Sequence, residues 1–312
     1  MEITQRLKVI SVNISEKKGT VKIPVKTIEI NETGIAGDAH AGPWHRQVSL
    51  LGSESIAKGS VIAGRDLAPG LFAENITTEG FPIYKMNYLD ILKSGTVTLQ
   101  VTQIGKKCHS GCDIFKEIGD CVMPKEGIFA RVISGGILKA GDEIVYHPKV
   151  YKAMLITLSD RASSGIYEDK SGALLRQILS DFYTGLDRPI TFTSRLIPDE
   201  APGLKENILE ASNNGYDFIF TTGGTGIGPR DITPDVVKQL LNKEIPGIME
   251  FIRMKYGTQF PSALISRSIA GTIGNSLIFT LPGSPKAVKE YLDEILKSLE
   301  HCVRMINGID KH

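Results

Sequence analysis

Four glycines lie within the stretch TTGGTGIGPRDITPD, residues 221–235. Glycine has no Cβ, so successive backbone N–H groups can approach an anion closely. Arg230 can neutralise phosphate charge, and Asp231 and Asp235 carry the carboxylates that Mg²⁺ prefers. The stretch lacks the GK[ST] of a Walker A loop and the spacing of GxGxxG. It therefore predicts an anion site of another kind, with a flexible turn between a strand and a helix as the alternative.

Three more polar segments each follow a predicted strand in the second half of the chain. Their candidate ligands are Ser159, Asp160 and Arg161 in SDRASSGIYEDKSG, Asp199 in LIPDE, and Ser284 and Lys286 in LPGSPK. The alternatives are an ordinary surface loop for the first segment and helix N-caps for Asp199 and Ser284. A lysine in the first turn of a helix is electrostatically unfavourable, which favours a phosphate ligand for Lys286.

Acid–base side chains are scarce at this predicted edge. The second half contains two histidines, His301 in the last predicted helix and His312 at the end of the chain. A phosphate nucleophile is already anionic and needs no general base. Positioning, Mg²⁺ and charge neutralisation can then supply the rate. The residues therefore predict phosphoryl or nucleotidyl transfer.

The elements that must position these loops alternate between strand and helix. Strands are expected at 153–160, 188–199, 217–224 and 276–283, and helices at 169–182, 204–215, 233–241, 245–257 and 285–307. This alternation predicts a parallel or mixed sheet covered by helices, whose ligands bind at the carboxyl ends of the strands. Thr233 and Ser284 each precede a proline and are predicted to be N-caps.

The first half has a different rhythm. Short runs rich in Val, Ile and Thr predict strands at 7–15, 19–30, 96–105, 129–136 and 140–148, with a helix at 53–60 and a helical turn at 114–118. Many short strands separated by turn signals indicate a barrel or a sandwich. The predicted domains are therefore residues 1–149 and 150–312.

Three cysteines gather within the first half. Cys108, Cys112 and Cys121 lie within fourteen residues, and Lys106 and Lys107 precede the first of them. Neighbouring cations stabilise a thiolate, so Cys108 is a candidate reactive residue. Together with His109 the cysteines could instead ligate a metal, although the C-x3-C spacing is unusual for zinc. A third interpretation places them in the core, and for Cys121 we favour it.

Composition excludes several classes of protein. The 312 residues carry a net charge of +1, with 41% hydrophobic and 23% charged residues, which is ordinary for a globular protein. The balanced charge argues against nucleic-acid binding. No apolar run approaches the ~20 residues that span a membrane, and the N-terminus lacks a signal-peptide core. We expect a cytoplasmic protein.

Taken in order, SDRASSGIYEDKSG, LIPDE, TTGGTGIGPRDITPD, LISRS and LPGSPK resemble the bacterial molybdopterin adenylyltransferase family. The resemblance covers residues 151 to about 305. It implies an α/β/α three-layer fold with a mainly parallel sheet, a homotrimer, and transfer of AMP from Mg-ATP to the terminal phosphate of molybdopterin.

The same resemblance implies site residues. Asp199 and Asp231 would be catalytic and would position Mg²⁺. The residues implied to hold the nucleotide or the pterin are Ser159, Asp160, Arg161, Gly223, Gly224, Thr225, Gly226, Ser266, Arg267 and Ser284, beside Arg230 predicted above.

In the first half, GDAHAG, RQVSLL, LFAENITTEG, GIFARVISGG and LKAGDEI resemble the MOSC domain family over residues 7–148. This resemblance implies a β-barrel-like module in which one cysteine carries sulfur or contacts molybdenum or tungsten. The motif places Cys108 best, although CHSGC offers two candidates. Proteins of molybdenum insertion or molybdoenzyme maturation are the implied partners.

Two hypotheses follow. The first is an enzyme of molybdenum cofactor biosynthesis that adenylylates molybdopterin and carries a MOSC domain acting on the same cofactor. The second is a non-catalytic molybdopterin carrier with a structural or zinc-bound N-terminal module. Detection of AMP transfer separates them.

Overall fold

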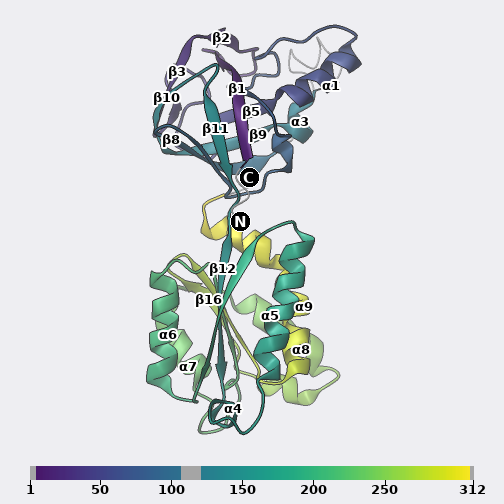
Figure 1. Cartoon of the computed structure of the whole chain (residues 1–312). Helices are drawn as coiled ribbons and strands as arrows, with labels where there is room; N and C mark the ends of the chain where they lie inside the picture. Colours follow the sequence, from purple (N-terminus) through teal and green to yellow (C-terminus); the bar gives the residue numbers. More distant parts are fainter. Residues whose placement is uncertain (1–4, 107–120, 310–312) are drawn as a thin grey trace. The chain divides into compact units, whose positions relative to one another are not determined.

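The computed structural model describes residues 5–106 and 121–309 and divides into two compact units (Figure 1). The first unit runs from the N-terminus to Lys149 and takes in the segment from Gly308. The second unit is Val150–Asn307, so its end differs from that of the predicted domain at 150–312. Across the described ranges, no helix is long and apolar enough to cross a membrane.

The first unit is a β-barrel with short helices. Its elements are β1 (Gln5–Ile14), β2 (Ile23–Val25), β3 (Thr27–Asn31), β4 (Gly34–Ile35), β5 (Val48–Gly52), α1 (Ser53–Ala63), β6 (Ile76–Glu79), η1 (Ile83–Lys85), β7 (Ile91–Ser94), β8 (Val97–Ile104), α3 (Met123–Glu126), β9 (Ile128–Ser134), β10 (Gly136–Lys139) and β11 (Glu143–His147). The large sheet has the order β11-β7-β8-β9-β5-β6-β1-β2, and an additional β11–β1 pairing closes it. Closure removes the open sheet edges, and the predicted barrel is confirmed.

One predicted strand of this unit is wrong in its extent. The run at 19–30 bends at Lys26, so that it forms β2 and β3 instead of one strand. β2 pairs with β1 in the barrel, whereas β3 pairs with β10 in a separate three-stranded sheet. The bend lets the chain pass from one sheet to the other.

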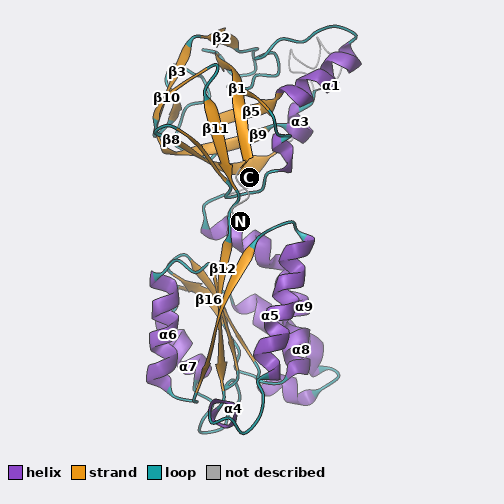
Figure 2. Ribbon diagram, viewed as in Figure 1, coloured by secondary structure: helices purple, strands orange, loops and turns teal. Residues whose placement is uncertain are grey.

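The second unit is a six-stranded sheet between two layers of helices. Its elements are β12 (Tyr151–Leu158), α4 (Asp160–Ser163), α5 (Lys170–Gly185), β13 (Ile190–Ile197), α6 (Ala201–Asn213), β14 (Phe218–Thr222), α7 (Thr233–Leu240), β15 (Lys243–Glu244), α8 (Pro246–Gly257), η2 (Pro261–Ile265), β16 (Ala270–Ile273), β17 (Ser276–Leu281) and α9 (Pro285–Ile306). Figure 2 shows α6 and α7 on one face of the sheet and α5, α8 and α9 on the other. The predicted three-layer fold is confirmed.

The strand order β13-β12-β14-β17-β16-β15 explains where the loops meet. β13, β12, β14 and β17 run parallel, and every residue of β14 and β17 is buried, as expected for strands covered on both faces. The loops that follow these four strands therefore leave the same edge of the sheet. The antiparallel pair β15–β16 was not predicted, because its strands are only two and four residues long.

Helix α9 forms as its sequence predicts. The Ser284 hydroxyl accepts a hydrogen bond from the Ala287 N–H at 3.2 Å, and Pro285 takes the first helical position. Val288, Leu292, Ile295 and other buried residues recur at helical spacing along the side facing the core. The helix therefore begins beside the carboxyl end of β17, next to the glycine loop.

Candidate active site

The glycine loop after β14, residues 223–228, has a backbone that other residues would distort. Gly223 and Gly224 have φ values of +99° and +62°. A Cβ on Gly223 would lie 2.3 Å from the Leu158 carbonyl oxygen, and one on Gly224 would lie 2.6 Å from Thr233 Oγ1. Both positions therefore require glycine, because a side chain there would clash with neighbouring atoms and strain the backbone.

The predicted N-cap role of Thr233 is wrong. Ile232 occupies the N-cap of α7, and Thr233 is the first helical residue. The Thr233 hydroxyl donates to the Gly223 carbonyl at 2.9 Å, and its N–H donates to the Gly224 carbonyl at 3.0 Å. The hydroxyl therefore ties the glycine loop to α7.

Asp231 closes the far end of the loop. Its Oδ2 accepts the Gly228 N–H at 2.8 Å, and its own N–H donates to the Gly228 carbonyl at 3.0 Å. A Cβ on Gly226 would lie 2.7 Å from the same Oδ2. The carboxylate is thus packed against the glycines, and among the described residues its Oδ1 takes no hydrogen bond.

Arg267 clamps this loop from the segment before β16. Its Nε donates to the Gly226 carbonyl at 2.6 Å, and another guanidinium nitrogen donates to the Asp231 carbonyl. Its Nη1 bridges both Asp235 oxygens at 2.8 and 2.9 Å. The guanidinium holds the loop in place and does not line the pocket that lies beside the loop. Asp235, one of the two carboxylates first considered for Mg²⁺, is committed to this ion pair.

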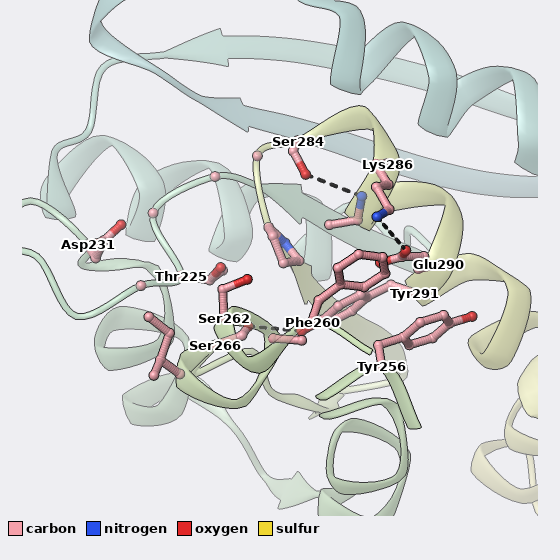
Figure 3. A pocket seen from close by; sticks show the side chains of 18 residues that line it. Thr225, Asp231, Tyr256, Phe260, Ser262, Ser266, Ser284, Lys286, Glu290 and Tyr291 are labelled. Atoms are coloured by element: carbon pink, nitrogen blue, oxygen red, sulfur yellow. Dashed lines mark hydrogen bonds and ion pairs between the residues drawn. The ribbon is translucent and has the colours of Figure 1, made fainter. Parts of the chain in front are cut away.

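A pocket of about 510 Å³ opens beside the loop. It brings together seven of the predicted site residues, namely Gly223, Gly224, Thr225, Gly226, Asp231, Ser266 and Ser284, as well as Lys286. Figure 3 shows Asp231 and Thr225 toward one end and Lys286 toward the other. Backbone amides, a helix N-terminus and a lysine in one concave site suit a polyphosphate.

The remaining predicted residues form a second group next to the pocket. Asp160 and Asp199 accept each other's backbone N–H groups, each at 3.1 Å, and Arg230 forms an ion pair with Asp160 at 2.5 Å. None of the three lines the pocket. The two groups meet at Gly224, where an added Cβ would lie 3.7 Å from Asp199 Oδ1.

Ser159 and Arg161 serve the local structure of the loop after β12. The Ser159 hydroxyl caps α4 by accepting the Ala162 N–H at 3.2 Å, and it lies 3.0 Å from the Tyr167 hydroxyl. The Arg161 guanidinium lies over the Tyr167 ring, 5.6 Å from its centroid. Asp199 itself is not a helix cap, because Glu200 occupies the N-cap of α6.

Asp199 and Asp231 each offer a carboxylate oxygen of the kind that Mg²⁺ binds. Asp199 and Asp231 each use Oδ2 for a backbone N–H, and Oδ1 of each takes no hydrogen bond within the described part of the chain. That part contains no group of three or more His, Cys, Asp or Glu residues able to hold a metal. Mg²⁺ commonly binds through one or two carboxylates and substrate phosphates, which matches this donor set.

Sequence reasoning missed one wall of the pocket. It is made of Tyr256, Phe260, Ser262, Glu290 and Tyr291. Glu290 could have been found, because it lies four residues after Lys286 on the same helix face. The aromatic residues carry no comparable signal, since aromatic side chains are usually core residues.

In the first unit, the Cys108 and Cys112 candidates lie outside the described residues. Cys121 is buried and packs with Phe72, Met123 and Phe129, so its predicted core position is confirmed.

The first unit also buries a polar cluster of Lys22, Asp38, Glu74 and Asn75. The Lys22 ammonium donates to the Asp38 carboxylate, which also accepts Asn75 Nδ2 at 3.0 Å. Burial raises the pKa of Asp38, but hydrogen bonds from His40 and Lys22 outweigh it and hold the pKa well below its usual range. Burial lowers the pKa of Lys22 despite this partner, and burial raises the pKa of Glu74.

The comparisons with known proteins agree with this geometry. Residues 137–301 match the family described as "Probable molybdopterin binding domain", and residues 37–145 match the MOSC domain. The chain is 37% identical over 155 residues to the molybdopterin adenylyltransferase of Helicobacter pylori strain J99, covering 49% of this chain and 86% of that protein. It is 34% identical over 167 residues to the molybdopterin adenylyltransferase of Escherichia coli K12, covering 49% and 84%.

A solved structure, the molybdopterin biosynthesis enzyme MoaB of Thermus thermophilus, is 36% identical to this chain. It matches 51% of this chain and 97% of its own length, with a TM-score of 0.46. These relatives and the MoaB structure each match about half of the chain. Because the family model matches residues 137–301, the chain belongs to the molybdenum cofactor biosynthesis family defined by the probable molybdopterin-binding domain, and its first half carries a MOSC domain.

Proposed function

We propose that the second unit is a molybdopterin adenylyltransferase. The observation that carries the proposal is the pocket in which the glycine loop, Asp231 and the N-terminus of α9 face one another. Similarity to adenylyltransferases at 34–37% identity supports the choice of reaction.

In this reaction the terminal phosphate of molybdopterin attacks the α-phosphorus of ATP. A new P–O bond forms between the two, the bond from the α-phosphorus to the bridging oxygen breaks, and pyrophosphate leaves with that electron pair. The nucleophile is already an anion, so no side chain needs to remove a proton. The protein's task is to align two anionic groups and to reduce their repulsion.

Each part of the site has a role in that task. The backbone N–H groups of residues 224–226 and the N-terminus of α9 would bind phosphate oxygens, whereas the Gly223 N–H donates to the Leu281 carbonyl at 3.0 Å. Asp199 and Asp231 would hold Mg²⁺, which neutralises charge on the polyphosphate when it is bound. Arg267 is a positioning residue, because it fixes the carbonyl groups of the loop and does not line the pocket.

The test is to incubate the full-length protein with Mg-ATP and molybdopterin and to detect adenylylated pterin and pyrophosphate by mass spectrometry. Asp231→Asn keeps an oxygen for the Gly228 N–H but removes the charge, so we expect a loss of about 100-fold in transfer. Asp181→Asn, an exposed substitution on α5, is the matched control. A wild-type protein that binds pterin without forming product would instead support the carrier hypothesis.

For the first unit, we propose that the MOSC domain binds the same cofactor or carries its sulfur or metal through Cys108. The proposal rests on the match at residues 37–145. Purified full-length protein, Cys108→Ser and the control Cys302→Ser would be compared for bound molybdenum, tungsten and zinc, and for persulfide by mass spectrometry. Loss of bound cofactor, metal or persulfide only in Cys108→Ser supports the proposal. Stoichiometric zinc without any of them supports a structural module.

We also propose that the protein is a homotrimer that works with molybdenum-insertion or molybdoenzyme maturation proteins. Light scattering after size-exclusion chromatography measures its mass directly. A monomer of 34.0 kDa would contradict the trimer.

A further inference from the structure

The pocket has an aromatic end whose purpose the phosphate chemistry does not explain. Phe260, just after α8, leaves 41% of its surface exposed while it lines the pocket. Tyr256 and Tyr291 line the same pocket, and Figure 3 shows all three rings away from Asp231. A concave site that combines an exposed aromatic face with a few polar groups is the usual surroundings of a flat ligand ring.

Two charged groups on α9 frame this end. Lys286 Nζ lies 3.2 Å from the centroid of the Phe260 ring, and it lies 3.8 Å from Glu290 Oε1. The ammonium thus sits over the electron-rich face of the ring. Its place in the first turn of α9 is unfavourable with respect to the helix dipole, and both Glu290 and Phe260 offset that cost.

A third contact holds Tyr291 in place in this wall of the pocket. The Tyr291 hydroxyl donates to Ser266 Oγ at 2.9 Å, so α9 is tied to the segment that precedes β16. Tyr291 is buried, whereas Phe260 presents its ring to the pocket. Of the aromatic side chains that line the pocket, Tyr291 is therefore fixed by a hydrogen bond, and Phe260 is open to a ligand.

We propose that Phe260, Lys286 and Glu290 are specificity-determining residues that bind a flat nitrogen heterocycle bearing an exocyclic amine. This inference rests on the proposed function and names the part of the substrate that this end takes. The ligand ring stacks on Phe260, and Lys286, whose side chain has four rotatable bonds, turns from the ring face to the ligand edge. Glu290 accepts a hydrogen bond from the amine, while Lys286 donates to a ring nitrogen or a carbonyl.

Both substrates of the proposed reaction have this chemistry. Adenine presents an amine beside a ring nitrogen, and a pterin presents an amine and a carbonyl. The neighbouring acceptor and donor on α9 match either edge, so the binding measurement must tell the two rings apart.

The experiment measures two dissociation constants on the full chain: Mg-ATP without molybdopterin by calorimetry, and molybdopterin without ATP by its fluorescence. Phe260→Leu keeps an apolar side chain but removes the stacking face. Loss of one base–aromatic stack weakens binding by about tenfold, so we expect that change for one substrate and less than about twofold for the other. Phe251→Leu on α8 is the matched control, because Phe251 is 55% exposed and does not line the pocket.

Two polar variants test the edge contacts. Lys286→Met keeps most of the stem, and Glu290→Gln keeps the shape but loses the charge. We expect each to weaken binding of the substrate that Phe260→Leu affects, by about tenfold for a charge-assisted hydrogen bond. Lys289→Met, an exposed lysine on the same helix, should leave both constants unchanged.

The outcome also identifies the ring. A selective loss for Mg-ATP assigns this end to adenine, and a selective loss for molybdopterin assigns it to the pterin. Four results would overturn the inference: dissociation constants that Phe260→Leu leaves unchanged, equal losses of affinity for both substrates, an equal effect of Phe251→Leu, or a wild type that binds neither substrate. Transfer is assayed on the same preparations. If the wild type transfers AMP but Phe260→Leu changes neither dissociation constant, only this inference is overturned. If the wild type transfers no AMP but Phe260→Leu weakens binding of one substrate selectively, only the proposed reaction is overturned.

Discussion

In the first unit, Lys22 and Asp38 pair with 0% and 1% of their side chains exposed, whereas in the second unit Arg267 and Asp235 pair with 36% and 60% exposed. Both are contacts between a cation and a carboxylate, but water screens them very differently. A buried charge that loses its partner is strongly destabilising, whereas an exposed pair contributes little to stability. The same chemistry therefore supports folding in one unit and loop geometry in the other.

The contrast shows which charged groups are available to a ligand. Around Asp38 the hydrogen bonds run to Ser15, His40 and Asn75, so its carboxylate oxygens serve the interior of the protein. Asp231 lines a pocket and keeps an oxygen free of hydrogen bonds from the described residues. Burial and hydrogen bonding, more than residue type, separate the carboxylate that serves the interior from the one that is open to a ligand.

The largest effect on this comparison is expected from Asp38→Asn. The change leaves the Lys22 ammonium buried beside a neutral side chain, which should lower the free energy of unfolding by about 3–5 kcal/mol. Urea unfolding followed by the fluorescence of Trp44, the one tryptophan of the chain, reports on the first unit. Glu143→Gln, which breaks the exposed Arg6–Glu143 pair, should cost less than about 1 kcal/mol. Equal losses in the two variants would show that the buried and the exposed ion pair contribute alike to stability.

Arg267→Lys tests the other side of the comparison. Lysine keeps the charge but cannot reach the Gly226 carbonyl, the Asp231 carbonyl and Asp235 at once, as the guanidinium does. We expect AMP transfer to fall by about tenfold through misplacement of the loop, with a small change in stability. Arg195→Lys, at an exposed pair with Glu210, is the control. Full activity in Arg267→Lys would show that the loop keeps its shape without the clamp.

The smallest effect concerns pH and Glu74. Burial raises the pKa of this carboxyl above its ordinary value of 4.5, so the folded state prefers the neutral acid while the unfolded chain ionises. Unfolding then releases a proton at any pH between the two pKa values, and stability falls as pH rises through that window. Glu74→Gln does not titrate. The wild type should therefore lose stability relative to this variant as pH increases from 4.5, by at most about 1.4 kcal/mol per pH unit.

The measurement is urea unfolding of both proteins at several pH values, again with Trp44 as the probe. Glu79→Gln, an exposed carboxylate on β6, should run parallel to the wild type. A stability difference between wild type and Glu74→Gln that does not change with pH would mean that Glu74 keeps its ordinary pKa.

The sequence by itself determined the local features of the second unit. The buried strands, the Ser284 cap and the glycine stretch all follow from short-range rules, because helix periodicity, capping and positive φ depend on neighbouring residues. The common edge of the loops also followed from the alternation of strands and helices along the chain, since parallel strands that alternate with helices leave their loops at one edge.

Only the tertiary structure decided which residues share the pocket. Arg267 reaches back across 36 residues to the Asp231 carbonyl, and Asp160 and Asp199 bond across 39 residues. Lys286, on α9, meets Phe260, which lies between α8 and η2. Contacts between segments so distant in sequence depend on strand order and helix packing, which short-range patterns do not specify. Thr233 shows the same limit. Its sequence position predicts a hydroxyl that caps the start of α7, but the hydroxyl donates a hydrogen bond to the carbonyl of Gly223, ten residues earlier.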